Sequence, residues 1–139
     1  MTPLGRGACL DLLTQVPIGR VAVSIGAMPA VRSVRFAVTT AGVVFRVVPS
    51  STLHRAVANA VVAFHADHYD EEGRLGWSVL VRGHCQEVLD PDDVAALEEL
   101  QLESWTDPPG RDRFVRVPLT IVTGEHVRWA SPGTAGDDG

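Results

Sequence analysis

The stretch PAVRSVRFAVTTAGVVFRVVPSSTL, residues 29–53, decides the fold that the sequence predicts. Two segments within it, residues 30–38 and 43–48, are rich in valine, and β-branched residues favour strands. The connection between them ends in Gly42, and glycine tolerates the positive φ angles of tight hairpin turns. The two segments are therefore predicted to pair as an antiparallel hairpin. Ser50 and Ser51 follow as candidate N-caps, so a helix with one apolar face is predicted next.

The residues before this stretch change from a helical to an alternating pattern. Apolar residues recur at helical spacing over residues 7–15, and Pro17 ends this predicted helix. Residues 18–25 then alternate with a period of two, which predicts a strand with one buried face. The inward residues are Val21, Val23 and Ile25, and the outward ones are Arg20, Ala22 and Ser24.

The residues after this stretch continue the succession of strands and short helices. The longest strand is predicted at residues 77–89, where Gly83 indicates a bulge or a bend. Asp90 and Pro91 begin a third helix. Its inward residues are predicted to be Val94, Leu97 and Leu100. The other predictions are, in chain order, a strand at 61–68, a solvated loop at 69–76, a loop at 105–110, closing strands at 113–122 and 125–129 broken at Gly124, and a disordered tail at 131–139.

This order of elements favours a mainly β fold, because antiparallel strands that follow one another close more readily into a barrel than into a parallel sheet. About six strands make a small closed barrel whose interior side chains fill it. The prediction is a six-stranded antiparallel split β-barrel in a single domain, residues 1–130. A flat ligand would have to lie against the outside of such a barrel, and the interface of a homodimer would cover it.

Composition narrows the classes of partner. The formal net charge of −5 disfavours a nucleic acid or an anionic membrane surface. No apolar run is long enough for a signal peptide or a membrane span. Cys9 and Cys85 stand far apart in no metal-binding or redox motif, which fits a reducing cytoplasm.

Metal binding and nucleophilic catalysis are not predicted. His65 and His68 in the HADH run point to opposite faces of a strand, so they cannot easily share one ion. His84 and His126 have no carboxylate at a spacing that indicates a nucleophile triad.

Three segments together resemble the pyridoxamine 5′-phosphate oxidase-like family of FMN-binding split barrels. They are residues 29–53, the run GWSVLVRGHCQEV at 76–88, and the run RFVRVPLTIVTG at 113–124. The resemblance extends over nearly the whole chain up to Trp129. It implies a homodimer that buries flavin mononucleotide (FMN) at its interface.

The resemblance also implies the cofactor-binding residues. The flavin ring would lie along one strand, and its ribityl phosphate would lie near the next strand and the helix that follows. Trp77 and Ser78 open the long strand, where the tryptophan serves either as a ring contact or as a packing anchor. The ring residues implied are Arg32, Ser33, Val34 and Arg35, and the phosphate-side residues are Phe45, Arg46, Val47, Ser51 and Thr52.

Several of these positions depart from the family pattern. Thr52 stands where a phosphate-binding lysine is usual, so Arg46 or Arg35 would have to supply the positive charge. Arg46 is the favoured candidate, because its strand leads directly into the predicted helix start at residues 50–53. Ser33, Arg35, Val47 and Ser50 stand where proline, asparagine, threonine and glycine are common. A deazaflavin coenzyme, or no cofactor, remains an alternative to FMN.

The resemblance implies a flavin-dependent oxidoreductase that transfers a hydride to a small molecule. In such an enzyme the cofactor carries the chemistry and the protein positions it, which explains why the sequence has no acid/base constellation. The alternatives are a deazaflavin-dependent reductase, a module that binds flavin without turnover or binds no cofactor, and a purely structural dimerisation domain. No residue identifies a substrate.

Overall fold

The computed structural model describes residues 1–103, 105 and 112–131. Within these residues the chain is mainly β, and its three helices are short. The elements are, in order, β1 (Thr2–Pro3), α1 (Arg6–Leu13), β2 (Ile18–Ile25), β3 (Met28–Thr39), β4 (Gly42–Val47), α2 (Thr52–Val57), β5 (Ala60–Asp70), β6 (Leu75–Glu87), α3 (Pro91–Glu98), β7 (Arg113–Val117) and β8 (Ile121–Arg128).

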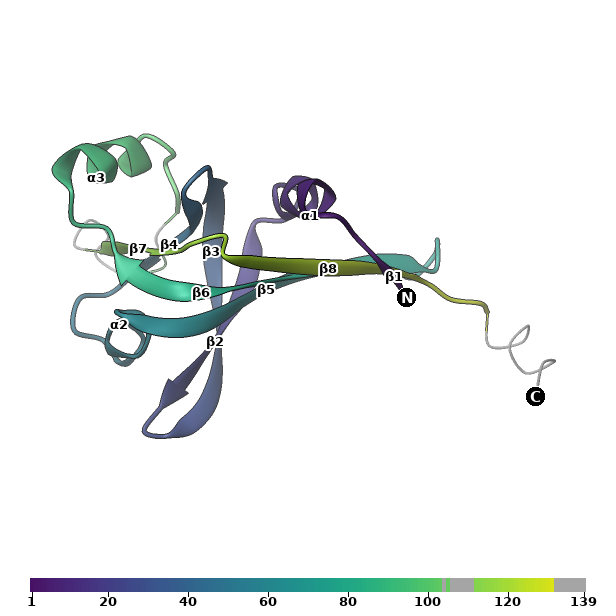
Figure 1. Cartoon of the computed structure of the whole chain (residues 1–139), viewed down its shortest axis with the longest axis horizontal. Helices are drawn as coiled ribbons and strands as arrows, with labels where there is room; N and C mark the ends of the chain where they lie inside the picture. Colours follow the sequence, from purple (N-terminus) through teal and green to yellow (C-terminus); the bar gives the residue numbers. More distant parts are fainter. Residues whose placement is uncertain (104, 106–111, 132–139) are drawn as a thin grey trace.

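Six strands form a closed antiparallel barrel (Figure 1). Their order around the ring is β6-β5-β2-β3-β4-β7, and β7 pairs back onto the end of β6. Two more strands lie outside the ring, because β8 pairs with the first part of β6 and β1 pairs with β8. The predicted six-stranded antiparallel split barrel is confirmed, with this two-stranded extension added.

The barrel interior is packed with side chains from the inward positions of the strands. Phe36 and Phe64 meet at its centre, with ring centroids 4.7 Å apart. Full burial of a side chain such as Phe64 contributes roughly 1.5–3 kcal/mol. Helix α1 lies over the β6–β8 region, while α2 lies at the other end of the barrel (Figure 1). Side chains of the described residues therefore fill the barrel interior.

A smaller apolar cluster lies outside the barrel, beneath α3. It consists of Val44, Val88, Leu97 and Phe114. Because of this cover, β4 is buried on both faces at Val43, Val44 and Phe45. The outward side chain of Arg46, next along the same strand, lies at the margin of this covered region.

The hairpin and the helix cap predicted from residues 29–53 are both confirmed. Strands β3 and β4 pair antiparallel, with Thr39 opposite Gly42 at the turn. The Ser51 hydroxyl caps α2 by accepting a hydrogen bond from the His54 backbone N–H at 3.1 Å. The alternation predicted for β2 is also observed.

The β5–β6 hairpin is longer than predicted, and the expected loop at 69–76 is wrong. Tyr69 pairs with Gly76 and Asp70 with Leu75, so only residues 71–74 turn. Exposed strand ends can carry charged residues on both faces, so their sequence lacks the apolar alternation that predicts a strand.

The break between the closing strands also lies elsewhere. It falls at residues 118–120, since β7 ends at Val117 and Pro118 has no N–H to continue the pairing. Gly124 lies inside β8, where an added Cβ would come 2.6 Å from the Cys9 Sγ atom of α1. The glycine therefore permits close packing of α1 on the strand.

Gly83 lies where β6 stops pairing with β8 and, a few residues later, begins to pair with β7. It does not form a bulge in the pairing with β5. The pairing of β6 with β5 continues unbroken through Val62–Gly83. A Cβ at residue 83 would lie 2.7 Å from the carbonyl oxygen of Pro118, where the chain passes from β7 to β8. Glycine is needed for this close approach.

The remaining predictions have mixed outcomes. Leu97 is buried, but Leu100 lies beyond the end of α3 and is 49% exposed.

Both cysteines are free and buried, and burial raises the pKa of the Cys85 thiol to about 12. Among the described residues, no helix has the length and apolar character needed to span a membrane. The predicted loop after Trp105 and the tail after Ser131 lie outside the described residues.

Candidate functional site

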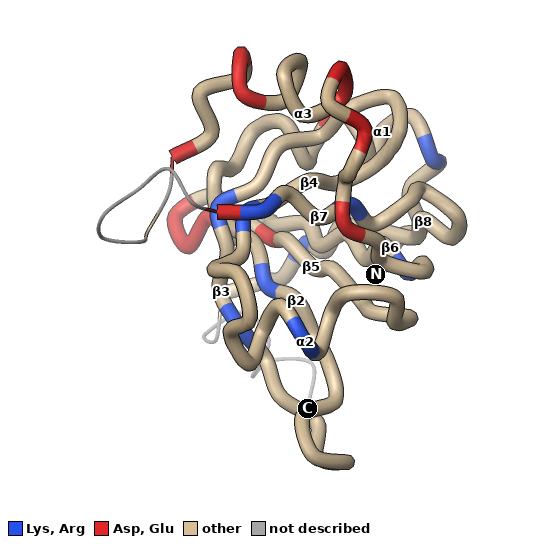
Figure 2. Tube along the Cα trace, turned by 90° about the vertical axis from the view of Figure 1, so that its left-hand side faces the viewer, with Lys and Arg blue, Asp and Glu red and all other residues tan. Residues whose placement is uncertain are grey.

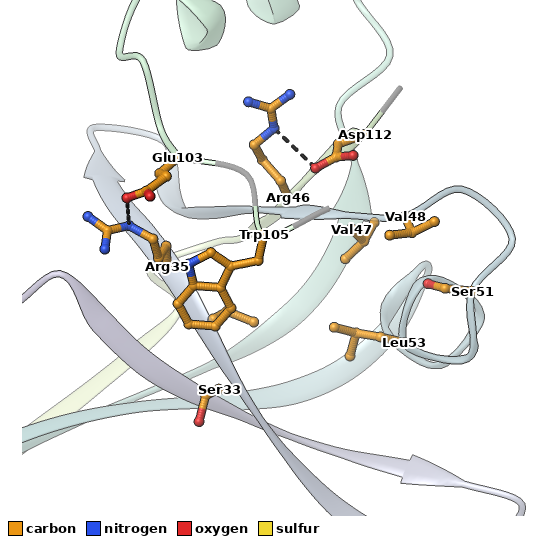
Figure 3. Close-up of a pocket in the computed structure, with 11 residues that line it drawn as sticks. Ser33, Arg35, Arg46, Val47, Val48, Ser51, Leu53, Glu103, Trp105 and Asp112 are labelled. Atoms are coloured by element: carbon orange, nitrogen blue, oxygen red, sulfur yellow. Dashed lines mark ion pairs between the residues drawn. The ribbon is translucent and has the colours of Figure 1, made fainter. Parts of the chain in front are cut away.

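A cavity of about 260 Å³ opens on the outside of the barrel between β3, β4 and the start of α2 (Figure 3). Its third side comes from residues on either end of the connection between α3 and β7. The indole of Trp105 reaches into it beside Arg35 (Figure 3). The lining residues are Ser33, Val34, Arg35, Arg46, Val47, Val48, Ser51, Leu53, Glu103, Trp105 and Asp112.

Arg35 faces outward on β3, two positions from Ser33 on the same face. Its Nε atom lies 3.2 Å from Oε2 of Glu103. The approach lacks hydrogen-bond geometry, so this buried N–H donor has no acceptor among the described residues. A buried donor without an acceptor costs about 1–3 kcal/mol. Arg35 is therefore suited to an anionic ligand with better geometry.

Arg46 makes more contacts with the protein than Arg35 does, although its Nε, like that of Arg35, is buried and makes no hydrogen bond among the described residues. Its Nη1 donates a hydrogen bond to the carbonyl of Leu102 at 3.0 Å, and its Nε lies 3.5 Å from Oδ2 of Asp112. The guanidinium also sits over the ring of Phe114, its direct partner across β4 and β7, 5.2 Å from the ring centroid. The side chain of Asp112 is only 3% exposed. These contacts give Arg46 a structural role, joining β4 to the segments that flank the α3–β7 connection.

His54, within α2, anchors the loop that leads into this helix, a role that the sequence pattern does not indicate. Its Nδ1 accepts a hydrogen bond from the Ser50 N–H at 2.9 Å, so its Nε2 carries the proton that is shared with Glu87 at 2.6 Å. Ser50 has a φ angle of 63°, a conformation that favours glycine. The His54–Glu87 pair thus fixes this strained loop to the end of β6.

Replacing His54 with alanine is expected to lower the free energy of unfolding by about 1–2 kcal/mol, because one charge-assisted bond and one backbone bond are lost. Arg55→Ala, an exposed change on the same helix, should stay within about 0.5 kcal/mol. Urea denaturation of the three proteins measures this. Equal stabilities for both variants would show that the pair does not hold the loop.

The structure brings part of the predicted cofactor-binding set together. The residues of that set that line the cavity are Ser33, Val34, Arg35, Arg46, Val47 and Ser51. Arg32 is exposed on the opposite face of β3, and Thr52 is exposed on α2 outside the cavity. Ser78 lines a separate groove on the outer face of the sheet with His65 and Glu125.

Two further residues of the predicted set lie elsewhere than in the lining of the cavity. Trp77 and Phe45 belong to the barrel core, with 8% and 0% exposure, because the alternation of β6 and β4 turns both side chains inward. They support the wall of the barrel and do not face the cavity. Neighbours from the distant α3–β7 connection, Glu103, Trp105 and Asp112, take part in the site instead.

A metal centre is not found among the described residues, where no group of three His, Cys, Asp or Glu side chains is placed to hold an ion. His65 lies 4.0 Å from Asp67, which in turn pairs with Arg20 at 3.3 Å. These three residues form an exposed polar patch on β2 and β5.

The fold and the cavity define a split-barrel protein with an arginine-bearing cleft on the outside of its barrel. The family model of pyridoxamine 5′-phosphate oxidase matches residues 5–126. The chain therefore belongs to the pyridoxamine 5′-phosphate oxidase family.

Proteins similar to this chain come from mycobacteria and from Mesorhizobium loti. The uncharacterized protein Rv0080 of Mycobacterium tuberculosis is 37% identical over 129 residues, 89% of this chain and 84% of that protein. The structure of an FAD binding protein from Mycobacterium smegmatis has a TM-score of 0.81 at 32% identity, covering 93% of this chain and 99% of that one. An FAD-binding protein of Mesorhizobium loti shows the shared fold alone, with a TM-score of 0.73 at 23% identity over 90% of this chain and 96% of that one.

Proposed function

We propose that this protein binds a flavin nucleotide in the cavity beside Arg35. The observation that carries the proposal is the buried Nε donor of Arg35, which lacks an acceptor among the described residues and lies in the same cavity as an apolar wall of Val34, Val47 and Leu53. Family membership supports it, as does the similarity to an FAD binding protein. That similarity favours FAD over the FMN implied by the sequence.

The lining residues fit such a ligand in chemistry. Val34, Val47 and Leu53 offer an apolar wall to a flat ring, and the Ser33 and Ser51 hydroxyls flank it. Arg35 would hold a phosphate, since a guanidinium matches phosphate oxygens with two parallel N–H groups. A bound flavin would supply hydride transfer, and the described residues would bind it, orient it and exclude water. The proposed activity is the reduction or oxidation of a small molecule.

The cavity is small for a whole flavin. Its volume of about 260 Å³ is below the roughly 300–1,000 Å³ typical of ligand pockets. Part of the ligand must therefore lie on the open surface or be covered by another subunit. A homodimer, the assembly that the family resemblance implies, would provide that cover.

The outer face of the sheet beside Ser33 suits a dimer interface. Val31 on β3 and Val61 on β5 are 60% and 78% exposed. Ala22 on β2 lies between these strands, because it pairs with Val31 on one side and with Ala63 of β5 on the other. Exposed apolar residues that gather on one sheet face indicate a contact with another protein surface. A two-fold dimer would bury this face against its own copy.

Val61→Glu is expected to weaken the dimer at least tenfold, because it places a like charge from each copy in an apolar interface. Leu89→Glu adds the same charge at a residue 73% exposed beyond the end of β6 and should leave the dimer intact. Sedimentation over a range of concentrations measures both variants. A monomeric unmodified protein would contradict the shared-site arrangement.

The direct test of flavin binding is the absorbance spectrum of the purified protein, with mass spectrometry of what heat releases. A flavin band and FAD in the supernatant support the proposal. A deazaflavin mass would reassign the cofactor. A colourless protein that fails to bind added FAD, FMN or riboflavin would contradict it.

A second candidate function is a cofactor-free module of the same fold. Two observations favour it. Thr52 replaces the usual phosphate-binding lysine, and both cavity arginines already face carboxylates of the same chain. The same spectrum and titration separate the two functions. The free buried cysteines agree with the cytoplasmic location proposed for either.

A further inference from the structure

Two arginine–carboxylate pairs line the same cavity, and they differ in burial. The side chain of Glu103 is 63% exposed and that of Arg35 is 31% exposed, whereas Asp112 is nearly enclosed. Exposed ion pairs contribute little to stability because water screens both charges. The Arg35–Glu103 pair is therefore the one of the two that a ligand can readily exchange.

Glu103 is also an imperfect partner for Arg35. The Nε–Oε2 distance is 3.2 Å, yet the buried Nε–H makes no hydrogen bond. The terminal phosphate of FMN offers three acceptor oxygens and each phosphate of FAD offers two, so either can meet a guanidinium with two parallel bonds. Carboxylate and phosphate are thus alternative anions for one cation, and a phosphate could accept the hydrogen bond that the Glu103 carboxylate does not.

Glu103 lies at the end of an acidic stretch of the chain. Acidic residues gather on and after α3, whereas arginines lie mainly on the sheet strands (Figure 2). The acidic residues of this stretch are Asp90, Asp92, Asp93, Glu98, Glu99 and Glu103. Figure 3 shows Glu103 turned toward Arg35 at the edge of the cavity.

We propose that Glu103 is an internal counter-ion that competes with the cofactor phosphate for Arg35 and so sets the affinity for phosphorylated flavins. The inference rests on the proposed flavin site. Arg35 is neutralised when the cavity is empty, and a phosphate must displace the Glu103 carboxylate to reach it. A flavin without phosphate leaves the pair in place. The flavin nucleotide is consequently held more weakly than Arg35 alone would hold it, and it exchanges more readily.

Glu103→Gln tests this by removing the competing charge with little change in shape. The variant should bind FMN and FAD about fivefold more tightly, the factor that corresponds to about 1 kcal/mol for an exposed ion pair. Riboflavin, which has no phosphate, should change less than twofold. Glu99→Gln is the matched control, because it removes an acidic charge at the end of α3 that faces no cavity arginine. Flavin fluorescence quenching measures all affinities, and the gain should shrink in 1 M salt.

The outcomes separate the two proposals. If the unmodified protein binds FMN and Glu103→Gln binds it equally well, the counter-ion role is overturned and the flavin site remains. An equal gain for riboflavin, or the same gain in Glu99→Gln, also overturns it, because the effect would then not depend on the phosphate or on Arg35. If none of the three proteins binds any of the three flavins, both proposals fail.

Discussion

Asp112→Asn is expected to lower the free energy of unfolding by about 3 kcal/mol. The side chain of Asp112 is 3% exposed and lies 3.5 Å from the Nε of Arg46, itself only 21% exposed. Removing one member of a buried ion pair costs about 3–5 kcal/mol, since the other charge remains without a counter-ion. Asparagine keeps the size of the side chain, so the loss reports the charge.

Denaturant unfolding measures this loss. Asp11→Asn, at an exposed position of α1, is the control and should change the free energy of unfolding by less than about 0.5 kcal/mol. The double variant Asp112→Asn with Arg46→Met should recover much of the stability, because no buried charge is then left unpaired. A loss below about 1 kcal/mol for Asp112→Asn would mean that the pair does not hold the strands together.

The burial of the Arg46–Asp112 pair also indicates which of the two cavity arginines is available to bind a ligand. The sequence favours Arg46 as the source of positive charge, because its strand leads directly into the start of α2, and it leaves Arg35 as the alternative. The structure separates them, because Arg46 already contacts Leu102, Asp112 and Phe114. A ligand would have to break a buried pair to use Arg46, but only an exposed one to use Arg35.

The barrel could be predicted because its signals are local. Alternation over residues 18–25 sets the inward face of β2, and the Gly42 turn joins β3 to β4 without any long-range information. The exposed ends of β5 and β6 lack such a pattern, so their pairing was missed. Gly124 misled the prediction, because a glycine that admits a neighbouring helix is indistinguishable in sequence from one that breaks a strand.

The only part of the cavity that could be predicted from the sequence is the part formed by the β3–β4 hairpin and the start of α2. Ser33, Arg35 and Arg46 come together because β3 and β4 are adjacent in sequence and in space. Glu103 and Asp112 reach the cavity from far along the chain, and no spacing rule connects them to an arginine more than 60 residues away. The bond between His54 and Glu87 has the same long-range character.

Arg35→Ala is expected to weaken the binding of FMN and FAD by about 10- to 100-fold. A hydrogen bond to a charged group is worth roughly 1.5–3 kcal/mol, and Arg35 would be the cation that holds the phosphate. The stability of the protein should change by less than about 1 kcal/mol, because the pair with Glu103 is exposed. Riboflavin should lose far less affinity than the nucleotides.

Arg32→Ala is the matched control for this last variant. Arg32 is an exposed arginine on the same strand, but it faces away from the cavity and bonds only the neighbouring Val31 carbonyl, at 3.3 Å, among the described residues. Its removal lowers the net charge equally, so it measures the long-range attraction of an anionic flavin. Fluorescence titration at two salt concentrations should show a small, salt-sensitive loss for Arg32→Ala and a large loss for Arg35→Ala. Equal losses would mean that Arg35 acts only through the general field of the protein, and that the phosphate contacts another part of the surface.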